Sequence, residues 1–299
     1  MRLNGPVLVT GATGNVGGAV ARSLQAAGIA PRVAGTDVAR LRARFPGVPA
    51  AHLDFGEPGT FDAALAGAAG LFLIRPPRIA RVGPTLNALV DHAVRHRVAH
   101  VVFASVAGAD RNPVVPHHRI ERHLRASGLP NTILRPGFFA QNLADAYGRD
   151  IRDDGRIYLP AAAGRVAFVD TRDIGDAAAA VFADPTAHRG AAHTLTGPQA
   201  LDFTQVAALL TEVLGRPVRY QPASVAGYLR HLRRRRVPVT QALVQTVLHA
   251  GLRRGQAERV DPALPLLLGR PARTLREYVT EHRDVWRWTP ASEPPKMSE

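Results

Sequence analysis

The stretch Pro6–Gly18 reads PVLVTGATGNVGG, in which an apolar run leads into three evenly spaced glycines, Gly11, Gly14 and Gly17. A helix-like pattern then runs from Asn15 to Ala27. Glycines let a backbone turn sharply and approach phosphates closely, and the free N–H groups at the start of the next helix supply positive potential. This order of strand, glycine turn and helix predicts a site for the pyrophosphate of NAD(H) or NADP(H).

The surroundings of the glycine turn support this prediction. A glycine triplet alone can arise by chance in a chain with 27 glycines. Here the turn directly follows an apolar, β-branched run, the helix ends at Gly28, and a second apolar segment follows at Arg32–Ala34. Together these segments form the βαβ unit that a dinucleotide-binding turn requires.

The same alternation continues along the first half of the chain. Strands are expected at Ala51–Asp54, Gly70–Ile74, Ala99–Ser105 and Thr132–Leu134. Helices are expected at Pro58–Ala66, Val82–Arg97 and His117–Ser127. Alternating strands and helices predict an α/β fold with a Rossmann-type, doubly wound parallel sheet of six strands, which binds ligands at the carboxyl ends of its strands.

The alternation weakens after Pro136. Segments Val166–Val169, Thr171–Ala183 and His193–Leu195 could return to the sheet, whereas Phe203–Leu214 and Val225–Arg254 have helical patterns without strands between them. We therefore expect a smaller, mainly helical, substrate-side domain at the C-terminal end. The expected boundaries are 1–136 for the nucleotide domain with returning segments near 165–197, 137–164 and 198–288 for the smaller domain, and 289–299 for a disordered tail.

Composition narrows the classes of chemistry. The chain has no cysteine, which excludes disulfides, thiol catalysis and cysteine metal sites. The sequence contains no apolar segment of roughly 18 residues, no signal-peptide pattern and no metal-ligand spacing. We expect a soluble, cytoplasmic protein with a small-molecule substrate, no membrane partner and no metal; a homodimer is open.

The formal net charge of +14 raises the possibility of nucleic-acid binding. The densest basic run, Arg230–Arg236, follows Val225, Tyr228 and Leu229 at helical spacing, which indicates the solvated end of an amphipathic helix. Nucleic acid is therefore an unlikely partner, although it or an acidic partner stays open as the alternative.

Five motifs share one order along the chain. They are TGATGNVG at 10–17, LFLIRPP at 71–77, VPHHRIE at 115–121, SGLPNTILRPGFF at 127–139 and VDTRDI at 169–174. In this order the chain resembles the NmrA-like group of atypical short-chain dehydrogenases/reductases over nearly its whole length. The resemblance implies an NAD(P)-binding protein, in a group that includes reductases of quinones, azo compounds and triphenylmethane dyes. It also includes redox sensors that bind the dinucleotide without turnover.

The resemblance also suggests catalytic candidates. Typical short-chain dehydrogenases use a Tyr four residues before a Lys, and none of the five tyrosines here lies in the expected region after the fifth strand. In related atypical enzymes a Lys or His four residues before a helical Glu faces the nicotinamide, which points to His117 ahead of Glu121. Its alternative role is a helix-start histidine that caps backbone N–H groups. Ser105, at the end of the fifth strand, is a second candidate that contacts substrate or completes a turn.

The positions expected to bind the cofactor lie in the glycine turn and at or shortly after the ends of strands. They are Thr10, Gly11, Thr13, Gly14, Asn15, Val16, Gly17, Thr36, Asp37, Arg40, Asp54, Phe55, Ile74, Arg75, Pro76 and Pro136. Asp54 has helix capping as its alternative role, and Arg75 could instead point to solvent. Asp170, Arg172 and Asp173 are expected to form a capping and ion-pair cluster outside the catalytic chemistry.

The choice between NAD and NADP depends on the end of the second strand. NADP-using relatives commonly place an arginine where Thr36 stands, because a guanidinium binds the 2′-phosphate in bidentate fashion. Asp37 favours NAD or merely caps the next helix, whereas Arg32, Arg40 and Arg42 lie near enough in sequence to bind the phosphate. The residues leave this choice open.

Phe138, Phe139 and Asn142 follow the sixth strand and are the substrate candidates; either phenylalanine could instead belong to the core. The favoured function is an NAD(P)H-dependent reductase of a small flat acceptor such as a quinone, azo or imine compound. In it His117 or water would supply the proton. The alternative is a redox sensor that binds the dinucleotide without turnover.

Overall fold

The computed structural model describes residues 3–287, which divide into two compact units. The first unit contains the residues up to Phe139 together with Val169–Pro198 and Asp261–Arg273. The second contains Ala140–Phe168, Gln199–Val260 and the residues from Thr274 onward. Each unit has its own strands and helices.

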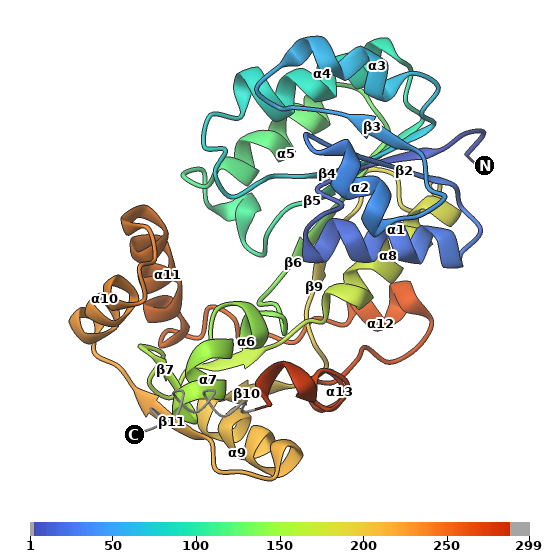
Figure 1. The fold of residues 1–299 in the computed structure, drawn as a ribbon. Coiled ribbons are helices and arrows are strands. Elements are labelled where there is room, and N and C mark those ends of the chain that lie inside the picture. Colours follow the sequence, from blue (N-terminus) through green and yellow to red (C-terminus); the bar gives the residue numbers. More distant parts are fainter. Residues whose placement is uncertain (1–2, 288–299) are drawn as a thin grey trace, which may run out of the picture. The chain divides into compact units, whose positions relative to one another are not determined.

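The first unit is built on a seven-stranded parallel sheet (Figure 1). Its order is β3-β2-β1-β4-β5-β6-β9, so the chain reverses direction across the sheet beside β1. This reversal is the switch point at which doubly wound sheets bind ligands. The strands are β1 (Val7–Thr10), β2 (Pro31–Gly35), β3 (Ala50–His52), β4 (Gly70–Ile74), β5 (His100–Ala104), β6 (Asn131–Pro136) and β9 (Ala192–Leu195). The predicted Rossmann-type fold is confirmed, with β9 as a seventh strand.

Helices cover both faces of this sheet (Figure 1). Neighbouring β1 residues serve opposite faces: Val7 and Val9 belong to one core cluster and Leu8 to the other, as expected for a strand buried on both sides. The first cluster takes side chains from α1 (Asn15–Ala26), α2 (Val38–Arg44), α8 (Thr171–Ala183) and α12 (Ala263–Leu268). The second takes them from α3 (Phe61–Leu65), η2 (Gly83–Asn87), α4 (Ala88–Arg95) and α5 (Pro116–Ala126). Two short helical turns, η1 (Pro58–Thr60) and η3 (Ala109–Arg111), complete the unit.

The second unit is mainly helical but also contains four short strands. β7 (Arg156–Leu159) pairs in parallel with β11 (Arg219–Pro222), and β8 (Arg165–Ala167) pairs antiparallel with β10 (Ala200–Asp202). The helices are α6 (Asn142–Asp145), α7 (Gly148–Asp154), α9 (Phe203–Leu214), α10 (Val225–Arg234), α11 (Val239–Leu252), α13 (Leu275–Glu281) and η4 (Arg283–Trp286).

Two expectations for this half of the chain were wrong. The segment Val166–Val169 does not join the large sheet as a strand; β8 pairs with β10, and Val169 makes only an isolated bridge to Phe139. The expectation that no strand separates Phe203–Leu214 from Val225–Arg254 was also wrong, because β11 at Arg219–Pro222 lies between them. The helical segment Val225–Arg254 itself forms two helices, because Arg236 adopts a left-handed backbone (φ 59°) and Pro238 has no N–H to continue the helical bonding.

The segment Asp261–Arg273 packs in the first unit, whereas the sequence pattern had grouped it with the smaller domain. Arg270 and Arg273 both pair with the fully buried Asp173 of α8, and the side chain of Leu264 lies in the first core cluster. Asp170 caps α8 by accepting from the Arg172 N–H at 2.8 Å, which confirms the expected capping cluster.

The expected tail at 289–299 lies outside the described residues. Among residues 3–287, no helix is both long and apolar enough to cross a membrane.

Candidate dinucleotide site

The glycine turn between β1 and α1 lies at the switch point of the sheet. Thr10 joins β1 to β4 there, because its hydroxyl donates to the Phe72 carbonyl (3.1 Å) and accepts from the Ile74 N–H (3.0 Å). Gly11 has a φ of +65°, and a Cβ on it would lie 2.5 Å from Cγ2 of Ile74. A Cβ on Gly17 would lie 2.4 Å from the Gly11 carbonyl oxygen. Only glycine therefore fits at either position.

Gly14 has a different role in the same turn. It is the N-cap of α1 and its own N–H donates to the Gly11 carbonyl at 2.9 Å, but a Cβ on it would meet nothing closer than 3.4 Å. The space beside Gly14 is thus open to a bound group. The first turn of α1 carries no acidic side chain, so its N–H groups present positive potential to an anion. This arrangement suits a pyrophosphate.

The helix after β2 brings one cation, Arg44, to the glycine turn. Asp37 accepts from the Arg40 N–H at 2.9 Å and so caps α2, which confirms its alternative role, while Thr36 and Arg40 are exposed. Arg44, at the end of α2, donates to the Thr13 carbonyl at 2.9 Å. Its cation also lowers the pKa of Arg22 of α1, although burial of Arg22 is the larger cause.

Of the arginines that follow the start of β2, the one in contact with the glycine turn is not one that the sequence spacing suggested. Arg32 donates to the Ala64 and Ala66 carbonyls, the latter at 2.6 Å, so its guanidinium is already held by the backbone. Arg44 was not among the residues predicted from the sequence, because it lies 31 residues after Thr13. One further turn of α2 beyond Arg40 brings its side chain back to the glycine turn. A cation seven residues after an N-cap aspartate is the pattern that would have found it.

The end of β3 supplies Asp54 and Phe55. Asp54 is half-buried, and its Oδ1 accepts from the Gly56 N–H at 2.8 Å in a tight turn. Phe55 is buried in the second core cluster. The Asp54 carboxylate therefore has a fixed orientation at the carboxyl end of the sheet.

Arg75 follows β4 and folds back over its own loop. Its Nη1 donates to the carbonyls of Pro76, Pro77 and Ile79, the last at 2.6 Å, and its Nε donates to Nε2 of His117 at 3.3 Å. The Arg75 side chain is half-buried, which lowers its pKa. It therefore joins the β4 loop to the start of α5 instead of pointing to solvent.

His117 lies in the first turn of α5 with its ring buried against the sheet. The ring stacks on Phe103 of β5, with centroids 6.2 Å apart and planes at 29°. Burial, and secondly the Arg75 cation, lowers the pKa of His117 to about 4. The imidazole is thus neutral at pH 7, and because Nε2 accepts from Arg75 the hydrogen-bond network assigns the proton to Nδ1.

Ser105 belongs to a buried polar cluster behind this histidine. Its hydroxyl donates to Oε1 of Glu121 at 2.6 Å, and Arg135 of β6 binds both oxygens of the same carboxylate, at 3.0 and 2.6 Å. Asp110 also pairs with Arg135, at 3.3 Å. The Glu121 carboxylate is therefore neutralised by Arg135, and the Ser105 hydroxyl already donates its proton to that carboxylate.

The remaining candidates follow β6. Pro136 ends that strand and its carbonyl accepts from Ala107 at 2.9 Å. Phe138 and Phe139 are half-buried, and Phe139 packs against the first core cluster. Asn142 begins α6 and belongs to the second unit. Within the described ranges no group of histidines and carboxylates has the geometry to hold a metal ion.

A doubly wound sheet with a glycine turn at its switch point defines a Rossmann-type dinucleotide-binding protein. The NmrA-like family model matches residues 4–266, and the chain belongs to that family.

Two relatives and one solved structure show the closeness of the match. An NAD(P)H azoreductase of Xenophilus azovorans is 34% identical over 281 residues, which cover 92% of this chain and 97% of the relative. Quinone oxidoreductase 2 of Escherichia coli is 28% identical over 92% of this chain and 97% of its own. The crystal structure of Citrobacter sp. triphenylmethane reductase complexed with NADP(H) superposes with a TM-score of 0.83 at 26% identity. It covers 92% of this chain and 99% of that protein.

Proposed function

We propose that this protein is an NAD(P)H-dependent reductase of a small flat electron acceptor, such as a quinone, azo or imine compound. The observation that carries the proposal is the glycine turn, where Gly11 and Gly17 are sterically required and the space beside Gly14 is open. The relatives that match over almost the whole chain, an azoreductase and a quinone oxidoreductase, support the reaction class.

The residues at the switch point fit a dinucleotide. The turn offers backbone N–H groups without a Cβ in the way. The Asp54 carboxylate, held in place by the Gly56 N–H, is proposed to contact the adenine amino group. When bound, the reduced nicotinamide supplies a hydride to the acceptor. His117 is proposed to orient the nicotinamide end through its Nδ1–H, since a neutral imidazole with a pKa of about 4 is a hydrogen-bond donor but a poor acid at pH 7.

We further propose a preference for NADP(H). The Asp37 carboxylate is engaged as a helix cap, whereas Arg44 holds its guanidinium against the glycine turn and Arg40 is an exposed cation one helical turn earlier on α2. A 2′-phosphate would relieve the repulsion between the Arg44 and Arg22 cations, so it has an electrostatic advantage there over a ribose hydroxyl.

The substrate residues remain a proposal from the sequence. Phe138 and Phe139 of the first unit are proposed to offer aromatic faces to a flat acceptor, and Asn142 of the second unit stays a separate substrate candidate. Ser105 is proposed to act through Glu121 by fixing the position of α5, the helix that carries His117, because its proton is already donated. The cytoplasmic location and the homodimer likewise stay predictions, the second testable by light scattering.

The test is a calorimetric titration with NAD, NADH, NADP and NADPH, followed by addition of a simple quinone to the nucleotide that binds best. We expect NADPH to bind most tightly. After quinone is added, the absorbance of the reduced nicotinamide should fall much faster than it does without protein. In His117→Ala we expect a slower rate with nearly unchanged NADPH affinity. Tight binding without oxidation across quinone, azo and imine acceptors would refute the reductase and indicate a sensor.

A further inference from the structure

Helix α11 exposes a continuous apolar face. Its inward side, which includes Ala242, Thr246 and His249, is buried. The opposite side carries five apolar residues that are 51% to 70% exposed at helical spacing. They are Val239, Leu243, Val244, Val247 and Leu248. Single exposed apolar residues are normal on protein surfaces, but five on one helix face indicate a binding surface.

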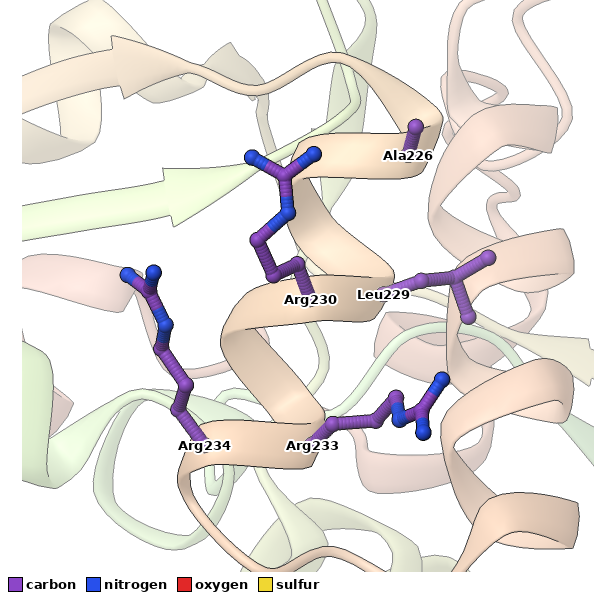
Figure 2. Close-up of a pocket in the computed structure, with 5 residues that line it drawn as sticks. All are labelled: Ala226, Leu229, Arg230, Arg233 and Arg234. Atoms are coloured by element: carbon purple, nitrogen blue, oxygen red, sulfur yellow. The ribbon is translucent and has the colours of Figure 1, made fainter.

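The neighbouring helix α10 adds positive charge to the same hairpin. The two helices pack together, with the rings of Tyr228 and His249 in edge-on contact at 5.5 Å. Figure 2 shows Arg230 and Arg234 projecting from one side of α10, and Leu229 and Arg233 from the other, around a hollow on its exposed face.

Nothing in the described chain neutralises these arginines. Asp150 and Asp154 of α7 are the carboxylates that reach this helix, and they pair with Arg235. Asp150 also pairs with His231. Among the described residues, no ion pair involves the three arginines of the hollow. The sequence from 213 to 257 contains no aspartate or glutamate. The hairpin is therefore an apolar face accompanied by uncompensated cations.

We propose that the α10–α11 hairpin binds the surface of an anionic phospholipid bilayer. Leucine and valine side chains of this kind insert at the boundary between headgroups and acyl chains, while arginines bind the phosphates around them. The expectation of no membrane partner rested on the lack of a segment that could span a bilayer. Binding at the surface needs no such segment and goes beyond the proposed reductase function.

Charge decides between this occupant and two others. A second copy placed symmetrically on the same face would bring two arginine-rich hairpins together, and residues 213–257 contain no carboxylate to neutralise their charge. A nucleic acid would match the arginines but leave the five apolar side chains in water. An anionic bilayer offers partners of both kinds, acyl chains for the apolar side chains and phosphates for the arginines.

The test is sedimentation of the full-length protein with phosphatidylcholine vesicles, with and without phosphatidylglycerol. We expect binding to the anionic vesicles alone. Val247→Ser and Leu248→Ser together should lower the partition coefficient by about tenfold or more. Each of Arg233→Gln and Arg234→Gln should lower it by about fivefold, the equivalent of about 1 kcal/mol per charge.

Matched controls are Leu266→Ser, an 80% exposed apolar residue of α12, and Arg125→Gln, an exposed cation of α5. Both should bind vesicles like the wild type, and the circular dichroism spectrum and urea midpoint of every variant check folding. Three results would overturn the proposal: no anionic vesicle binding, equal loss in the controls, or binding that the arginine variants weaken and the Val247 and Leu248 pair leaves unchanged. Concentration-dependent dimerisation abolished by the apolar pair would assign the face to a second copy instead.

Discussion

Gly17→Ala tests the glycine turn most sharply. The added Cβ would lie 2.4 and 2.5 Å from the Gly11 carbonyl oxygen and carbon and 2.7 Å from the Thr10 oxygen, whereas ordinary contacts begin at 3.4 Å. The turn and α1 must therefore separate by up to about 1 Å, the difference between 3.4 and 2.4 Å. Retreat of α1 is opposed by α8, whose Gly175 packs against the Ala19 backbone so closely that a Cβ there would lie at 2.7 Å.

We expect this substitution to reduce the free energy of unfolding by about 2 kcal/mol, the usual cost of overpacking a tight site. A displacement of this size at an anion site should also weaken NADPH binding by at least tenfold. Urea unfolding gives the first quantity and calorimetric titration the second. Both effects arise from the same collision, so they should appear together.

Two further glycine variants separate fold from binding. Gly14→Ala should weaken NADPH binding while changing stability little, because its Cβ would enter the space proposed for the pyrophosphate and not the protein. Gly59→Ala, whose Cβ would meet nothing within 4 Å, should change neither. If Gly17→Ala matched the wild type in urea midpoint and in NADPH affinity, the steric reasoning for the turn would be refuted.

Three other outcomes follow from buried charge. Glu121→Gln should reduce the free energy of unfolding by about 3 kcal/mol in urea titrations, because Arg135 then loses its buried bidentate carboxylate and keeps only the exposed Asp110 at 3.3 Å; an unchanged midpoint would contradict this. Burial lowers the pKa of His100 and His249 to about 4, below the unfolded value of 6.5, so the stability they contribute is present above pH 6.5 and lost as pH falls towards 4. The free energy of unfolding from urea titrations should therefore fall between pH 7 and pH 5, by up to about 1.4 kcal/mol per pH unit for each histidine. A free energy of unfolding that does not change over this range would show that the two histidines are not buried in the neutral form. For His117, whose pKa is likewise about 4, the reductase rate should show no imidazole titration between about pH 6 and 8. A step in the wild-type pH–rate profile that is absent in His117→Ala would contradict this.

Local spacing was enough to predict the nucleotide-binding half. The positions of Gly11 and Gly17 encode a backbone turn directly, and near-continuous apolar runs such as Gly70–Ile74 mark strands buried on both faces. The strands of the second unit have no comparable local sequence pattern. β11, Arg219–Pro222, is short and largely exposed, so no apolar alternation indicated it.

Contacts between distant residues account for the rest. The sequence predicted that His117 begins a helix. It did not predict that the guanidinium of Arg75, 42 residues earlier in the chain, fixes the tautomer of this histidine. It placed Ser105 at a strand end, but not the donation of its proton to Glu121. Such partners depend on how strands order themselves in the sheet, which no short window of sequence contains.

The central claim is that this chain binds NADPH at the glycine turn and passes its hydride to a flat acceptor. The most direct measurement is a single-turnover reaction, with protein in excess over NADPH and a simple quinone added, followed at the absorbance of the reduced nicotinamide. We predict complete oxidation at a rate far above that of the protein-free mixture, with Gly59→Ala as fast as the wild type and Gly17→Ala much slower. An NADPH signal that decays at the protein-free rate, or equally fast with Gly17→Ala, would contradict the claim.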